Sequence, residues 1–175
     1  MPKLRKMLND VNADYIQSFM RLIETQSKET IAKWCVNYAE ENILPLWLKD
    51  FPEDPRPGNA LADARDFLGG NIKLADAKKQ INGCRAAARE AESSHIAQGA
   101  ARTIDVAANT IHNPAGSIAI AFYGGLTLAY SKKGLDAPWE ELEQTAIEEC
   151  VKMRESFVKI MVEDEPNSAK IDWGC

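Results

Sequence analysis

The stretch LADAKKQINGCRAAAREAESSHIAQGAARTIDVAANTIHNPAGSIAIAFYGGLTLAYS, which spans Leu74 to Ser131, decides the fold. Alanine and other small residues dominate it, and alanine has the highest helix propensity of all residues. Small side chains also let helix axes approach toward the short end of the usual range of about 8–10 Å. We therefore predict three closely packed helices that form a central layer, at about 74–92, 94–111 and 114–131.

Glycines occur inside these predicted helices, where each costs about 1 kcal/mol relative to alanine. Close contact between helix backbones would justify that cost, so we expect a neighbouring helix to approach closely at each position. The glycines in question are Gly83, Gly99, Gly116, Gly124 and Gly125.

Apolar residues recur at helical spacing on both sides of this stretch. Signals for strands are scarce, because no segment combines strict alternation with β-branched residues. The predicted fold class is all-α, a compact bundle of about seven helices with a central layer of alanine- and glycine-rich helices. The remaining helices are expected at about 12–26, 27–42, 57–68 and 136–162, with 44–48 as an apolar plug of the core.

A chain of 175 residues favours a single domain, here 1–175 with its core at about 12–162. The acidic tail 163–175 is expected to be extended, although Ile171 and Trp173 are apolar enough to dock back on the bundle.

The chain carries a formal net charge of -5, which argues against a general nucleic-acid binder because such proteins need a basic surface. The same charge would suit a basic partner. No apolar segment follows the basic start as in a signal peptide, and no stretch is long enough to cross a bilayer. We therefore expect a cytoplasmic protein away from the membrane, in which the four cysteines are free thiols: Cys35, Cys84, Cys150 and Cys175.

Three prolines within six residues make the segment 50–57 a stiff connector without regular structure. It holds Asp54 and Arg56 in an exposed position. These two side chains either contact a partner or a ligand carboxylate, or form a local ion pair that sets the turn. Glu53 beside them and Glu141 in the last helix are exposed acidic residues that we expect to assist in partner binding.

Four residues of the middle block could together line a ligand pocket: His95, His112, Cys84 and Tyr123. A nucleophilic cysteine needs a partnered histidine, and the histidine spacing of common zinc motifs is missing. The competing interpretation gives the histidines roles at helix ends and makes Cys84 a buried small hydrophobe. We expect no catalytic residue, no metal site and no cofactor.

Two segments carry a family resemblance. The run Ala39-Glu40-Glu41-Asn42-Ile43-Leu44-Pro45-Leu46, and the later Asp54-Pro55-Arg56-Pro57 leading into Ala60-Leu61-Ala62-Asp63-Ala64-Arg65, resemble the opening of a bacterial putative immunity protein family. The block Cys84-Arg85-Ala86-Ala87-Ala88-Arg89-Glu90-Ala91 extends the similarity. The resemblance implies an all-helical, non-enzymatic protein that binds and neutralises a cognate toxin of a polymorphic toxin system. It implies no catalytic residues.

Three functions therefore stay open. The first is neutralisation of a protein toxin by occlusion and charge complementarity. The second is a small-molecule- or metal-binding protein, or an enzyme, with a pocket between the helices. The third is an interaction module that forms homo-oligomers through its small-residue helices and its amphipathic last helix.

Overall fold

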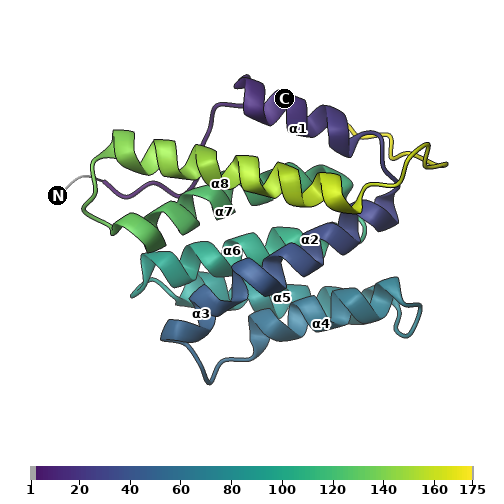
Figure 1. Ribbon diagram of the computed structural model, residues 1–175. Coiled ribbons are helices and arrows are strands. Elements are labelled where there is room, and N and C mark those ends of the chain that lie inside the picture. Colours follow the sequence, from purple (N-terminus) through teal and green to yellow (C-terminus); the bar gives the residue numbers. More distant parts are fainter. Residues whose placement is uncertain (1–2, 175) are drawn as a thin grey trace.

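The computed structural model describes residues 3–174, so Cys175 and its expected free thiol lie outside the described residues (Figure 1). The prediction of an all-α fold is confirmed, since the part of the chain from 3 to 174 contains one isolated β-bridge and no longer strand. In order, the elements are α1 (Asp14–Ile23), α2 (Lys28–Asn42), α3 (Leu44–Asp50), α4 (Arg56–Leu68), α5 (Leu74–Glu90), α6 (His95–Asn109), the 3-10 turn η1 (Pro114–Gly116), α7 (Ser117–Lys133) and α8 (Trp139–Ile160).

The segment predicted as an apolar plug is a short helix of its own, α3. Pro45 lies in its first turn, where a missing backbone N–H costs nothing, and Trp47 on it is fully buried. Ser27 and Ser94 cap α2 and α6 with their hydroxyl groups, whereas Asn113 and the region of Asp136 provide no side-chain cap.

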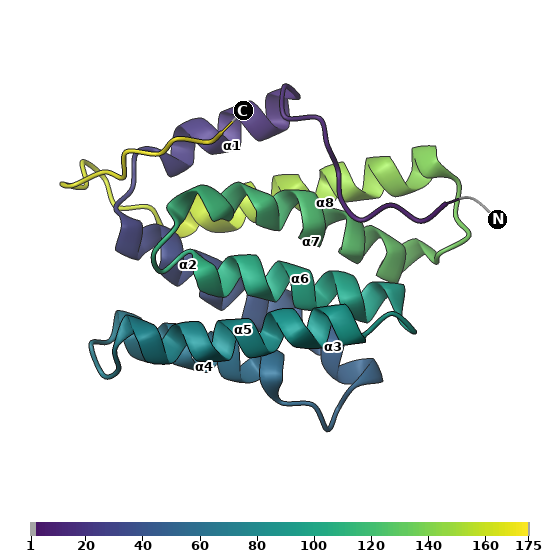
Figure 2. The ribbon, with the colours of Figure 1, turned by 180° about the vertical axis from the view of Figure 1, so that it is seen from behind.

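Helices α4 to α8 run antiparallel to their neighbours in sequence, and short connections join them (Figures 1 and 2). Both views show α7 and α8 on one side of α6, and α4 and α5 on the other, while α2 crosses one face of the bundle. Twelve of the 17 residues of α7 are buried, so this helix is covered on almost all sides, while α6 lies between α5 and α7 at the centre of the predicted layer.

Helices α6 and α7 meet through two reciprocal pairs of glycine and threonine. A Cβ atom added at Gly99 of α6 would overlap Thr127 Oγ1 of α7, and one at Gly124 of α7 would lie 3.1 Å from Thr103 Cγ2 of α6. Both threonines bond their hydroxyl groups back to their own helices, Thr103 to the carbonyl of Gly99 at 2.8 Å. The expected close approach is therefore confirmed between these helices.

A third close approach joins α7 to α8, because a Cβ at Gly125 would lie 2.9 Å from Cys150 Sγ. At Gly116 an added Cβ would make only ordinary contacts, the nearest at 3.5 Å. The expectation is wrong for Gly83, where nothing lies within 4 Å of an added Cβ. A stretch rich in small residues thus predicts close packing for the layer, but not for each position.

Both ends of the chain fold back onto the bundle. Leu8 donates its backbone N–H to Phe122 of α7 at 3.0 Å and is buried, as is Ala169 in the tail. Trp173 docks as the sequence suggested, and its indole N–H donates to Glu24 at 2.6 Å. The core therefore extends beyond the predicted limits of 12 and 162. None of the helices in the described part of the chain has the length and apolar character that a membrane crossing requires.

Candidate partner-binding site

Within the connector of residues 50–57, residues 51–55 join α3 to α4, and a charged pair fixes their conformation. Arg56 donates from Nε to Asp54 Oδ1 at 3.0 Å and from Nη2 to Asp54 Oδ2 at 2.7 Å. Its backbone N–H also donates to Asp54 Oδ1, at 3.1 Å, so one carboxylate holds both the side chain and the first turn of α4. The hydrogen bonds from Arg56 lower the pKa of Asp54. Of the two interpretations of this pair, the local ion pair that sets the turn is the geometry observed.

Arg56 also reaches across to the end of α5. The same Nη2 atom donates to Glu90 Oε2 at 2.6 Å, so the guanidinium is shared between two carboxylates. Its hydrogen bonds with Asp54 and then with Glu90 raise the pKa of Arg56. A third of the Arg56 side chain stays accessible to solvent. The pair is therefore structural and, at the same time, presented on the surface.

Behind the connector, Trp47 acts as its anchor. The indole N–H of this buried residue donates to the Asp54 carbonyl at 3.0 Å, and its ring stacks on Phe51 with centroids 4.6 Å apart. Asp50 accepts a hydrogen bond of 2.6 Å from Ser94 at the start of α6. The connector is therefore fixed to α3, α4, α5 and α6, and it can be presented to a partner with little loss of conformational entropy.

Toward solvent, residues 50–56 line a hollow of about 550 Å³. Pro52, Glu53 and Pro55 are exposed along it, and Leu48 of α3 is exposed nearby. Glu53 has no ion-pair partner within residues 3–174, so its charge is available to a partner. This surface combines apolar rings with a free acidic group on a rigid frame, and such preorganised sites bind proteins with a low ordering cost.

Glu141 does not join this surface. It lies in the first turn of α8 and forms an ion pair of 3.3 Å with Lys133. Figures 1 and 2 show α8 and the connector on opposite sides of the bundle, with α6 between them. The structure thus brings Glu53, Asp54 and Arg56 together and leaves Glu141 apart.

The four residues considered for a ligand pocket do not form one group. His95 begins α6 and His112 follows its end. The 15 residues of this helix extend about 22 Å, so the two histidines are far apart. His95 contacts the Arg5 carbonyl and the ring of Tyr130, whereas His112 contacts Asn109. In the described part of the chain no group of three or more potential metal ligands comes together.

Cys84 and Tyr123 lie on two other helices, α5 and α7. Cys84 is fully buried and donates to the carbonyl of Ala101 at 3.4 Å, and its burial raises the pKa of the thiol far above the ordinary value. A thiol with such a pKa is a poor nucleophile. Tyr123 is partly exposed on α7.

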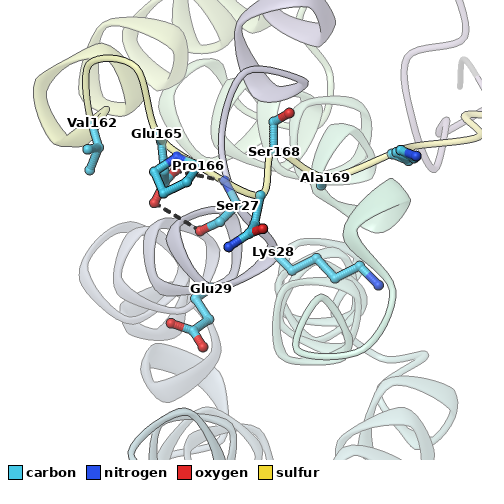
Figure 3. A pocket seen from close by; sticks show the side chains of 10 residues that line it. Ser27, Lys28, Glu29, Val162, Glu165, Pro166, Ser168 and Ala169 are labelled. Atoms are coloured by element: carbon cyan, nitrogen blue, oxygen red, sulfur yellow. Dashed lines mark hydrogen bonds between the residues drawn. The ribbon is translucent and has the colours of Figure 1, made fainter.

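A second polar centre, at the start of α2, was not expected from the sequence. Here the tail lies over the helix, and both segments line a hollow of about 780 Å³ (Figure 3). Glu165 accepts hydrogen bonds from the Ser27 N–H at 2.7 Å, the Ser27 hydroxyl at 3.0 Å and the Thr30 hydroxyl at 2.7 Å. Burial acts to raise the pKa of Glu165, but these hydrogen bonds outweigh it and the pKa is lowered. The carboxylate therefore serves as an added cap of α2.

Three roles in these sites were missed from sequence, namely those of Trp47, Glu90 and Glu165. No local pattern could have revealed Glu90 or Glu165, because their partners lie 34 and 138 residues away. Trp47 had a signal, since a large aromatic side chain directly before the proline-rich segment is the natural anchor for it.

The fold defines the class of protein, which is an all-helical bundle built around a core of small residues. Within that class, the chain belongs to the Imm-5 like putative immunity protein family, whose family model matches residues 21–156. The matched region begins in α1, includes the connector and ends in α8. No curated protein and no solved structure matches the chain.

Proposed function

We propose that this protein binds a cognate bacterial toxin in the cytoplasm and neutralises it by occlusion, without chemistry of its own. Membership of the immunity protein family is the observation that carries the proposal, because it implies a protein partner. The three described cysteines support a cytoplasmic site of action, since all of them are free and buried.

The connector is the surface that we propose for the toxin. Its backbone is held by the Asp54–Arg56 pair and by Trp47, and Glu53 is the free charge on it. A basic toxin surface would gain electrostatic steering from the net charge of -5 and a direct contact at Glu53. Asp54 and Arg56 would act by holding the shape that the toxin meets.

Co-expression with each toxin-like gene encoded beside this one tests the proposal. The wild-type chain should protect cells from one of these toxins and should bind it in a purified complex. Glu53→Lys reverses a charge with no ion-pair partner in the described residues, and it should weaken binding about tenfold, mainly through slower association.

Asp172→Lys is the matched control for charge. Asp172 is exposed on the tail, which both views place on the side of the bundle away from the connector. This variant makes the same change in net charge and should keep full affinity. A neighbourhood without a toxin-like gene, together with no protection by the wild-type chain, would count against the function. Equal effects of the two variants on binding would show that the connector is not the surface that binds the toxin.

A further inference from the structure

Exposed apolar side chains gather at the end of α8. Large hydrophobic residues are exposed at four places in the described chain, and three of these lie within five residues of sequence: Val158, Ile160 and Val162. Val158 lies two helical positions before Ile160 and therefore faces another side of α8, whereas Ile160 and Val162 line one groove. We call Ile160 and Val162 the α8 ridge. The backbone of Val162 is fixed by Gln26, which accepts from its N–H at 2.9 Å and donates to its carbonyl at 3.1 Å. The ridge is therefore presented on a rigid frame.

A groove of about 430 Å³ runs between α2 and α8 directly beside the ridge, and Ile160 and Val162 form part of its wall. Its floor contains the stacked rings of Trp34 and Tyr38, with centroids 5.2 Å apart. The indole N–H of Trp34 is already bound to Ser156 Oγ at 2.8 Å, so the floor needs no polar ligand. We call this feature the α2–α8 groove.

The ridge and the groove share one face of the molecule. A contact between two identical chains related by a two-fold axis requires this arrangement, because each chain must offer both the projecting group and the surface that receives it. Contiguous exposed apolar groups on a soluble domain are typical of such interfaces.

The charges along α2 also suit a contact between two copies related by a two-fold axis. Lys33 and Glu41 are exposed lining residues of the groove, and each lies four positions from Asn37. Neither forms an ion pair within residues 3–174, although Lys33 lies near enough to Glu165 to help lower the pKa of that carboxyl. A two-fold axis near Asn37 would place Lys33 opposite Glu41 of the partner subunit, twice in one dimer. The two charges sum to zero, so the groove complements a copy of itself better than it complements a basic toxin.

We propose that the α2–α8 groove and the α8 ridge bind a second copy of this chain in a two-fold dimer. The ridge of each copy packs on the groove of the other, and Lys33 pairs with Glu41 of the partner subunit. The interface does not include the connector, so it is independent of toxin binding by that segment.

Sedimentation analysis of the full chain, from micromolar to near-millimolar concentrations, tests the proposal. The mass should rise from 19.4 kDa to twice that value. Lys33→Glu and Glu41→Lys should each weaken the dimer about tenfold, because each places two like-charged pairs in the interface. The double variant should restore the wild-type affinity. Ile160→Asp should weaken the dimer roughly a hundredfold.

Leu48→Asp is the matched control, because Leu48 on α3 is 40% exposed and Ile160 is 43% exposed. It should leave the dimer intact. The charge variants change exposed positions, so they keep the test valid if Ile160→Asp fails to fold.

A mass of 19.4 kDa at all concentrations would overturn the proposal. A double charge variant no better than the single ones would do the same. Loss of toxin binding in Ile160→Asp, with a monomeric wild type, would assign the face to the toxin instead. Protection against the toxin is a separate measurement, so failure of the dimer leaves the function proposed above untouched.

Discussion

Replacing Gly99 by alanine tests the close approach of α6 and α7. The added Cβ would overlap Thr127 Oγ1 and would lie 3.3 Å from its Cγ2. Rotation of Thr127 about its first side-chain torsion, which is stiff in a helix, would displace its hydroxyl from the Tyr123 carbonyl, to which it is bound at 2.7 Å. The added Cβ is therefore accommodated only if Thr127 leaves its present rotamer in this tight contact or if the two helices move apart.

The magnitude follows from two opposed terms. Overpacking at a buried contact between rigid helices costs about 3 kcal/mol, and the gain in helix propensity from glycine to alanine returns about 1 kcal/mol. The variant should therefore lose about 2 kcal/mol of unfolding free energy, which lowers the melting temperature by about 4–8 °C for a chain of this size.

Gly83→Ala is the control, since it makes the same change in a helix where nothing lies within 4 Å of the new Cβ. This variant should gain up to about 1 kcal/mol. Urea unfolding followed by circular dichroism measures both. Adding Thr127→Ala to Gly99→Ala should recover at least about 1 kcal/mol relative to the sum of the single variants. If Gly99→Ala proves as stable as the wild type, the reciprocal glycine–threonine contact does not hold the central layer together.

Three further predictions concern the polar groups and the thiols. The pKa of Glu165 is lower in the folded chain than in the unfolded one. Its stabilising effect should therefore be complete above about pH 4.3 and should disappear as the pH falls through the folded pKa. Glu165→Gln should lose about 1 kcal/mol of unfolding free energy at neutral pH, and urea unfolding curves should show a weaker dependence on acid pH. Arg56→Lys should lower the unfolding free energy by less than about 1 kcal/mol, because the paired groups are partly exposed, but it should speed proteolysis of the connector, since lysine cannot bind Asp54 through two parallel hydrogen bonds. Burial raises the pKa of three thiols, those of Cys35, Cys84 and Cys150. These thiols should resist iodoacetamide in the folded chain and react fully in denaturant. Mass spectrometry of labelled peptides measures the reaction, and early labelling of any of the three would contradict their burial.

Helix content and order could be predicted from sequence because they depend on spacing within a few residues. The small-residue layer was predicted in this way, and the apolar side chain of Trp173 suggested its return to the bundle. The misses have a common cause. Gly83 resembles Gly99 in local sequence, and only the position of the neighbouring helix distinguishes them.

In the candidate site, too, local features could be predicted from sequence and contacts between distant residues could not. Proline spacing predicted a stiff connector, and the two-residue separation of Asp54 and Arg56 allowed a local pair. The contribution of Glu90 and the separation of Glu141 from the connector depend on how the helices pack. The distance between the two histidines is set by the length of α6, which local sequence predicts.

The amino-acid sequence by itself determined that this chain folds into helices around alanine and glycine, because helix propensity and apolar spacing act over one or two turns. It also determined the stiffness of the connector, since proline restricts its own backbone and that of the residue before it. Tertiary structure alone decided which glycines touch a neighbour, which charges are paired and which apolar side chains stay exposed. These properties depend on groups that are distant in sequence, and their contacts exist only after the helices have packed.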